Sequence, residues 1–190
     1  MVDWFRLKHS IRLLFILSPT GRADYIRKNK LFRHMGNNCM VMFRKLPLYP
    51  QLIYFGNNVR IASNVTFITH DAIHNMLNIK TKTHEFKEHI GCIKIDDNVF
   101  IGANSIILPN VNIGKNTIVA AGSVVNRDIG EGVFGGVPAK FLCSIDEFMI
   151  KRKTILKNNI CDHELPNADM SMVWANFYER RLDCETETKS

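Results

Sequence analysis

The chain carries a six-residue repeat, a pattern that very few folds can accommodate. It runs through residues 55–72 and resumes over 95–130. Apolar residues recur about every 3.6 positions on an amphipathic helix and every second position on a strand, so neither element alone produces a period of six. The nine blocks read FGNNVR, IASNVT, FITHDA, IDDNVF, IGANSI, ILPNVN, IGKNTI, VAAGSV and VNRDIG.

Three positions of the repeat predict a coil with three sides. The first position is always apolar, and the fifth is small or β-branched except at Asp71, which suits inward-facing sites on short strands. The fourth is asparagine in six blocks and His70, Gly122 or Asp128 in the others; all four residue types tolerate a left-handed backbone and predict a corner. Three such sides close a coil of about eighteen residues, and stacked coils form a parallel β-helix.

The segments on either side of the repeat are predicted to be helical. Ser18 followed by Pro19 is a start signal for the second of two N-terminal helices. Ser144 and Glu147 have the spacing of a capping box, which predicts a C-terminal helix that caps the open end of the coils. The predicted domains are an N-terminal helical segment (1–34), a β-helix domain with a loop inserted at about 72–91 (35–142), and a C-terminal helix and tail (143–190).

The first predicted helix has an apolar stripe. Trp4, Leu7, Ile11 and Leu14 recur at helical spacing, whereas cationic residues lie off the stripe. We expect the stripe to pack on the protein itself. The alternative is contact with a membrane surface, to which the net charge of +7 would also contribute.

The composition indicates the cellular compartment and which partners are expected. The five cysteines are scattered and form no CxxC pair, which indicates free thiols in a reducing compartment. The apolar run LLFIL is too short to cross a bilayer, so we expect a cytoplasmic protein. No nucleic-acid motif accompanies the basic charge, and no nucleic-acid partner is expected.

The repeat resembles that of the hexapeptide-repeat acyltransferases over residues 36–141, most specifically in the segment from Ile101 to Leu142. The resemblance is closest to galactoside and maltose O-acetyltransferases, nodulation-factor acetylases, and capsule or lipopolysaccharide O-acetyltransferases. It implies an all-β-dominated, left-handed parallel β-helix that uses acetyl-CoA as the acyl donor. It also implies a homotrimer with active sites between subunits.

His70 is the predicted catalytic residue. An imidazole titrates near neutrality and is able to take the proton of a hydroxyl group that attacks a thioester. The resemblance places His70, in FITHD, at the catalytic histidine of the family. His70 and His74 have the spacing of a zinc pair on a helix, but the chain leaves a corner here and no metal is expected. The candidate acceptor-binding residues are Arg44, Asp71, His84 and His89. The alternative orienting partners for His70 are Asp71, Glu85, Glu88 and a backbone carbonyl.

The resemblance also implies which residues bind the acyl donor. Ala103, Ala121 and Gly122 correspond to positions along the pantetheine arm, where small residues permit close approach to the backbone. Asn126, Arg127 and Lys140 correspond to positions near the nucleotide and its phosphates, where cations are favourable.

The function that these residues predict is acetyl transfer from acetyl-CoA to a hydroxyl of a sugar or polysaccharide precursor. In relatives an asparagine helps to hold the acceptor. It has no counterpart near Met42 and Arg44, so the sequence leaves the identity of the acceptor open. Alternatives are N-acetylation of an amino sugar, acetylation of serine or an antibiotic, and a catalytically silent solenoid used for assembly.

Overall fold

The computed structural model describes residues 4–157, 171, 173–175, 177 and 178. Two compact units make up the chain, Met1–Ile145 and Asp146–Ser190. The first unit holds the repeat and the N-terminal helices. The second is described mainly through helix α4 (Ile145–Lys157), which begins directly after Ser144 as predicted. The division at residues 34 and 142 stays a prediction, as does the capping role of α4.

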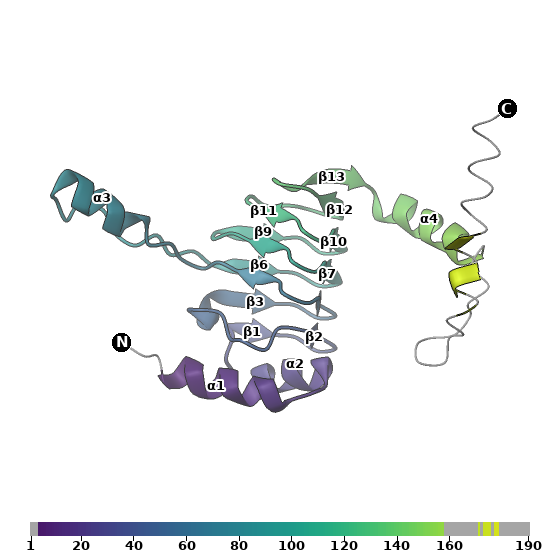
Figure 1. Ribbon diagram of the computed structural model, residues 1–190, viewed down its shortest axis with the longest axis horizontal. Coiled ribbons are helices and arrows are strands. Elements are labelled where there is room, and N and C mark those ends of the chain that lie inside the picture. The colour runs from purple at the N-terminus through teal and green to yellow at the C-terminus, as the bar shows by residue number, and fades with distance from the viewer. Residues whose placement is uncertain (1–3, 158–170, 172, 176, 179–190) are drawn as a thin grey trace. The chain divides into compact units, whose positions relative to one another are not determined.

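The strands of the first unit are short and lie in three sheets (Figure 1). The first sheet contains β1 (His34–Met35), β3 (Ile53–Phe55), β6 (Ile93–Ile95) and β9 (Val111–Ile113). The second contains β2 (Met40–Val41), β4 (Arg60–Ile61), β7 (Val99–Ile101), β10 (Thr117–Val119) and β12 (Gly132–Gly135), followed by the antiparallel β13 (Lys140–Cys143). The third contains β5 (Thr66–Phe67), β8 (Ile106–Ile107) and β11 (Val124–Val125).

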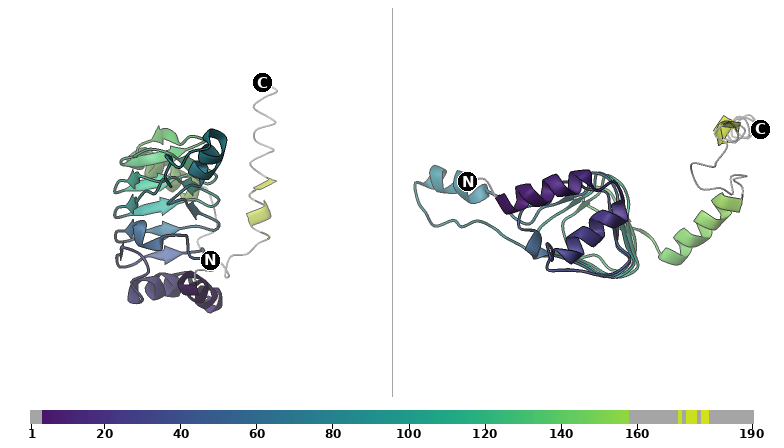
Figure 2. Two further views of the ribbon diagram at one scale, coloured as in Figure 1. Left: turned by 90° about the vertical axis from the view of Figure 1, so that its left-hand side faces the viewer. Right: turned by 90° about the horizontal axis from the view of Figure 1, so that it is seen from below.

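Consecutive strands of the repeat belong to different sheets, so the chain passes through all three before it returns to the first. Each strand then pairs in parallel with the strand one coil away, as Phe100 of β7 does with Ile118 of β10. Seen from below, the coils overlie one another in a closed outline (Figure 2). The predicted stacking of coils is therefore present.

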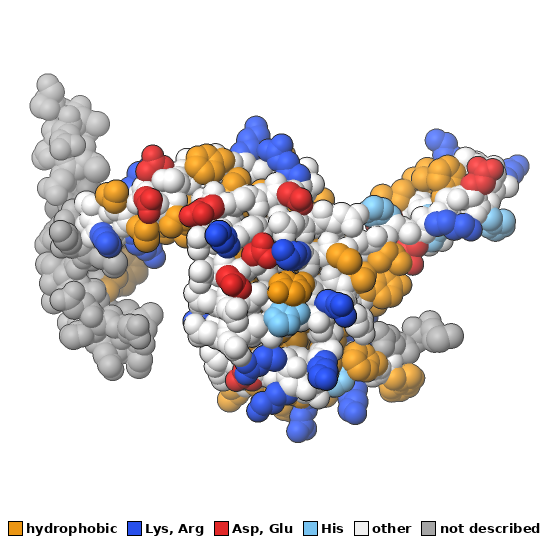
Figure 3. Space-filling model, turned by 180° about the vertical axis from the view of Figure 1, so that it is seen from behind, with side chains coloured by type: hydrophobic (Ala, Val, Ile, Leu, Met, Phe, Trp, Pro, Cys, Tyr) orange, Lys and Arg blue, Asp and Glu red, His pale blue; other side chains and the backbone are white. Residues whose placement is uncertain are grey.

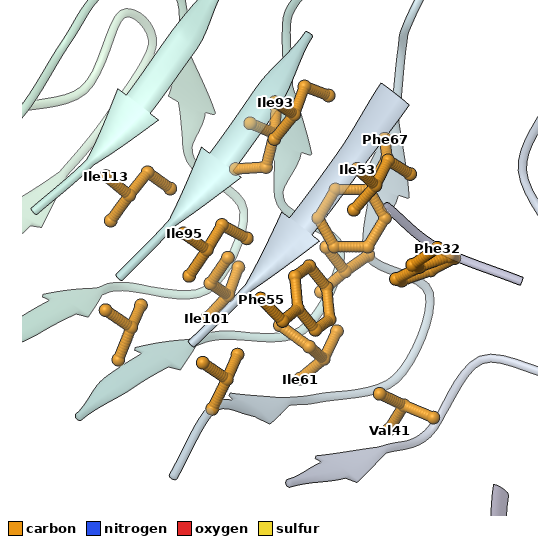
Figure 4. Close-up of a cluster of buried hydrophobic side chains, with 14 of the residues drawn as sticks. Phe32, Val41, Ile53, Phe55, Ile61, Phe67, Ile93, Ile95, Ile101 and Ile113 are labelled. Carbon is orange, nitrogen blue, oxygen red and sulfur yellow. The ribbon is translucent and has the colours of Figure 1, made fainter. Parts of the chain in front are cut away.

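The interior of the coils is filled by the first and fifth positions of the repeat. Every predicted first-position residue is buried, and so is every predicted fifth-position residue except Asp71. Figure 4 shows the isoleucines stacked in rows, with Phe32, Phe55 and Phe67 gathered at the N-terminal end. The ring centroids of Phe55 and Phe32 are 5.2 Å apart, and those of Phe55 and Phe67 are 5.6 Å apart.

The corners depend on left-handed residues, as the sequence predicted for most blocks. The six fourth-position asparagines have φ between +54° and +60°, and Gly122 has φ +71°. Asn58, Asn98 and Asn116 also join their side-chain amides along one corner, which ties successive coils together. The prediction is wrong at His70 and Asp128, neither of which has a positive φ. Asp128 instead accepts a hydrogen bond from the backbone N–H of Asn112, 2.8 Å away in the coil before it.

The left-handed corner predicts different outcomes for two substitutions of Asn64, which has φ +59°. Alanine has a Cβ that crowds the backbone in this conformation, so Asn64→Ala should lower the free energy of unfolding by about 1–2 kcal/mol. Asn64→Gly should cost clearly less, because glycine adopts positive φ freely. Denaturant unfolding of the two variants measures this difference, and an equal loss for both would contradict it.

The N-terminal helices α1 (Trp4–Phe15) and α2 (Pro19–Lys28) lie against the first coil (Figure 1). Ser18 caps α2 as predicted, since its hydroxyl accepts a hydrogen bond from the N–H of Gly21. The guanidinium of Arg22 is buried and donates to the carbonyl oxygens of Ile16 and Leu17, and to that of Val41 in β2. One side chain therefore joins the end of α1 to the coil.

The prediction that the apolar stripe of α1 packs on the protein itself is wrong. Trp4, Leu7, Ile11 and Leu14 are all exposed. The helix turns its opposite side inward, and its two buried residues are His9 and Leu13. A hydrogen bond of 2.8 Å joins His9 Nδ1 to the hydroxyl group of Tyr25 in α2, and Ser10 accepts one from the N–H of Leu46. These polar contacts, which hydrophobic periodicity does not register, set the rotation of the helix.

Burial of His9, together with the charge of Lys8, lowers the pKa of its imidazole below the usual 6.5. The unfolded chain therefore binds a proton at a pH at which the folded chain does not. The neutral His9 stabilises the fold above about pH 6.5, and this stabilisation is lost as the pH falls from about 6.5 toward the lower pKa of the folded chain. Between about pH 7.5 and about pH 5.5, the melting temperature of the wild type should fall further than that of His9→Gln. Thermal unfolding at both pH values measures this, and an equal loss in the two proteins would contradict it.

The inserted segment leaves the coil after β5 and returns at β6. The sequence predicted a loop at about 72–91; the structure has helix α3 (Ile73–Thr81) within it, carried away from the coils on two extended legs (Figure 1). A short 3₁₀ turn, η1 (Pro50–Leu52), precedes β3. Among the described residues, no helix has the length and apolar character required to cross a membrane.

Candidate active site

His70 lies where the chain leaves the third sheet. It pairs with Ile90 as an isolated antiparallel bridge, so the outgoing and returning legs of the inserted segment run side by side. Two backbone hydrogen bonds fix this pairing, from Asp71 N–H to the His89 carbonyl oxygen (3.0 Å) and from Gly91 N–H to the Thr69 carbonyl oxygen (2.8 Å). The extended pairing replaces the left-handed corner predicted for His70.

Tyr49 contacts His70 edge to face, with 5.3 Å between the ring centroids. Its φ of +49° is unusual for a bulky residue, and such conformations concentrate at functional sites. Two hydrogen bonds hold the Tyr49 segment here. The Thr69 hydroxyl donates to the Leu48 carbonyl oxygen at 2.7 Å, and the Tyr49 hydroxyl donates to Glu88 Oε1 at 3.4 Å. His70, Tyr49 and Glu88 therefore form one cluster.

The imidazole of His70 is half-buried, and its Nδ1 is buried with no hydrogen-bond partner among the described residues. Two of the suggested orienting carboxylates have other partners: Asp71 accepts from the N–H of Ile73 at the start of α3, and Glu88 accepts from Tyr49. Glu85 is exposed. The described contacts that hold the ring are its packing against Tyr49 and the pairing of the His70 backbone with Ile90. A neutral imidazole in this place has one nitrogen lone pair with which to take a proton.

The candidate acceptor-binding residues are spread over several elements. Arg44 donates to the carbonyl oxygen of Leu14 at the end of α1, at 2.7 Å. His89 lies 3.4 Å from the Asn110 amide, through Nε2, and His84 is exposed on the returning leg. The structure joins neither Arg44 nor His84 to His70. A groove of about 740 Å³ lies beside β5, the edge strand of the third sheet, with Arg44, Leu48 and Phe67 among its lining residues.

The candidate donor-binding residues other than Lys140 occupy two different edges of the third sheet. Ala103 and Ala121 are stacked one coil apart at the corner that enters the sheet, and Gly122 N–H donates to the Ala103 carbonyl oxygen at 2.8 Å. The stacking is close, because a Cβ on Gly102 would lie 2.4 Å from the backbone nitrogen of Ala121.

Asn126 and Arg127 are exposed at the corner that leaves the third sheet, the same edge as His70 but two coils further along. Lys140 is exposed at the start of β13. The chain therefore carries cationic side chains near the C-terminal end of the coils and the imidazole nearer the middle.

Tyr49 is the site residue that sequence reasoning missed. No site residue was predicted between Pro47 and Pro50, where the two prolines interrupt the first coil. The available signal was a tyrosine flanked by Pro47 and Pro50, about one coil before His70 in the sequence. No group of three or more residues among the described histidines, cysteines, aspartates and glutamates is arranged to hold a metal ion.

Comparison with known proteins agrees with the geometry. The family "Bacterial transferase hexapeptide (six repeats)" matches residues 92–127. Protein CapG of Staphylococcus aureus is 42% identical over 139 residues, which cover 71% of this chain and 76% of that protein. A galactoside O-acetyltransferase of Lactococcus lactis is 30% identical, with coverage of 73% and 70%. The match to the Escherichia coli galactoside O-acetyltransferase spans only about half of that enzyme, 55%, at 34% identity.

Solved structures show the same architecture. A hexapeptide-repeat acetyltransferase from Vibrio cholerae superposes with a TM-score of 0.57 at 25% identity, covering 74% of this chain and 89% of that one. A galactoside acetyltransferase in complex with coenzyme A gives a TM-score of 0.52 at 25% identity, with coverage of 75% and 82%. The repeat, the stacked parallel coils and these relatives together show that the chain belongs to the hexapeptide-repeat acetyltransferases.

Proposed function

We propose that the protein transfers an acetyl group from acetyl-CoA to a hydroxyl of a sugar or polysaccharide precursor, with His70 as the general base. The observation that carries this proposal is the position of His70: a half-buried imidazole, packed against Tyr49 at the place where an inserted segment leaves the coil. Family membership supports the acyl donor, and relatives named as galactoside O-acetyltransferases support a sugar hydroxyl as the acceptor.

The transfer is direct. His70 takes the proton of the acceptor hydroxyl as that oxygen forms a bond to the thioester carbonyl carbon. The C–S bond then breaks, and the imidazolium returns its proton to the departing thiolate. In this mechanism a backbone N–H at the Ala103 corner stabilises the negative oxygen of the tetrahedral intermediate.

An acyl-enzyme route has little support from the described cysteines. Burial raises the pKa of the Cys39 thiol, whose sulfur lies against the carbonyl oxygens of Gly36 and Gly56, so it is a poor nucleophile. Cys92 and Cys143 are free thiols outside the His70 cluster. Free thiols also support the cytoplasmic location that we propose.

We further propose a left-handed winding of the coils and a homotrimer with sites between subunits. Ala103 and Ala121 lie on one edge of the third sheet, and His70 lies on the other. The six residues between these edges extend over at most about 20 Å. A threefold assembly of three-sided coils sets the Ala103 edge of one chain beside the His70 edge of the next, which would complete the site.

The test is a screen of acceptors with acetyl-CoA, in which thiol release is measured and the product is identified by mass and by alkaline lability. An ester formed on a sugar hydroxyl supports the proposal. Exclusive formation of an alkali-stable amide would replace it with N-acetylation. Tight acetyl-CoA binding without any transfer would favour an assembly role.

A further inference from the structure

The outward side of α1 is an apolar surface that the protein does not cover. It consists of Trp4, Leu7, Ile11, Leu14 and Phe15, which are exposed by 74%, 40%, 47%, 52% and 78%. At about 100° per residue these side chains fall within roughly one-third of the helix circumference. We call this set the α1 outer face. Leu13 and His9, on the other side, fix the helix to the protein, so the outer face is presented in one orientation.

Cations border the α1 outer face. Lys8 and Arg12 are exposed on its edge toward α2, and α1 contains no acidic residue. Lys28, the last residue of α2, is also exposed. Figure 3 shows basic and hydrophobic side chains side by side at the end of the molecule that these helices form. A groove of about 670 Å³, whose lining includes Trp4, Phe15, Lys8, Arg12 and Tyr25, joins the two kinds of side chain.

We propose that the α1 outer face binds the surface of a bilayer that contains anionic phospholipids. A short helix with an apolar face, flanking cations and an aromatic residue at each end has the composition of helices that lie in the membrane interface. Twelve residues extend over about 18 Å, so the helix lies along the surface and does not cross the bilayer. A partner of this chemistry matches both the apolar groove and its charged rim.

A second copy of the chain paired face to face through α1 matches the same surface less well. Each copy carries a net charge of +7, and pairing two such faces would bring Lys8 and Arg12 of one copy near the same cations of the other. An anionic lipid surface instead attracts these cations, by about fivefold in binding for each one that reaches the headgroups. The charge pattern therefore favours the bilayer.

The experiment measures co-sedimentation of the full-length protein with vesicles of phosphatidylcholine alone, or with about one-third phosphatidylglycerol. We expect binding to the anionic vesicles that exceeds binding to the neutral ones by about tenfold or more, and that weakens at high salt. The double variant Leu7→Glu/Ile11→Glu should lower binding by about a hundredfold, because two inserted apolar side chains are replaced by charges. Its matched control is Met76→Glu/Ile79→Glu, which makes the same change on exposed residues of α3.

A second pair of variants tests the contribution of the cations Lys8 and Arg12, which border the α1 outer face. Lys8→Gln/Arg12→Gln should lower binding to anionic vesicles by about tenfold or more, whereas Lys151→Gln/Arg152→Gln removes the same charge from α4 and should have little effect. All replaced residues are exposed, and melting temperatures verify folding.

Absence of vesicle binding by the wild type would overturn the proposal. Equal binding by the α1 variants and their controls would also overturn it, as would an oligomer that dissociates when Leu7 and Ile11 are replaced. Transfer to a soluble acceptor should survive Leu7→Glu/Ile11→Glu, so failure of this inference is distinguishable from failure of the proposed reaction.

Discussion

Replacement of His70 by alanine should lower the turnover number for acetyl transfer by about two to four orders of magnitude, the usual effect of losing general-base assistance. The dissociation constant for coenzyme A should change little, because Ala103, Ala121 and Arg127 are on other parts of the coil. Steady-state kinetics, with coenzyme A titrated separately, measure both quantities.

The matched control for this prediction is His34→Ala. His34 is an exposed histidine in β1, where it stacks on Tyr54 at a centroid distance of 4.7 Å. Its removal should leave turnover within about twofold of wild type, since no step of the proposed reaction uses it. A His70→Ala variant that kept nearly full turnover would show that another group takes the proton.

Replacement of Phe55 by alanine should be among the most destabilising single changes in the chain. Phe55 is fully buried and contacts Phe32 and Phe67, so the variant loses both hydrophobic burial and contact with the rings around it. We expect the free energy of unfolding to fall by about 3–5 kcal/mol. Equilibrium unfolding in denaturant measures it.

Phe100→Ala removes the same side chain from an outward position of the neighbouring coil, where it is 41% exposed. Its cost should be less than about 1 kcal/mol, as for most exposed substitutions. Equal losses for Phe55→Ala and Phe100→Ala would mean that the inward and outward positions of the repeat are assigned incorrectly.

The repeat made most of the coil predictable from the sequence. Each block fixes one corner and two inward residues through local chemistry, so Ile61, Val65 and Asn64 were placed correctly without reference to distant parts of the chain. Stacking then repeats the same contacts from coil to coil. The chain's relationship to acyltransferases followed from the same blocks.

Features that depend on contacts between remote segments were not predictable in this way. The conformation of His70 is set by pairing with Ile90, and its aromatic neighbour Tyr49 comes from another coil. The rotation of α1 is set by the bond between His9 and Tyr25. In each case a specific polar or aromatic contact determines the observed conformation. Periodicity and corner propensity had predicted a different one.

A crystal structure of the protein with coenzyme A bound tests the central claim most directly. The account predicts that the pantetheine arm lies along the Ala103 and Ala121 corner, with its sulfur within about 4 Å of a His70 imidazole, the distance required for reaction at the thioester. The imidazole should come from a neighbouring subunit, because His70 and the Ala103 corner of one chain lie at opposite edges of the third sheet. Coenzyme A bound elsewhere, or a sulfur remote from every His70 in the assembly, would contradict it.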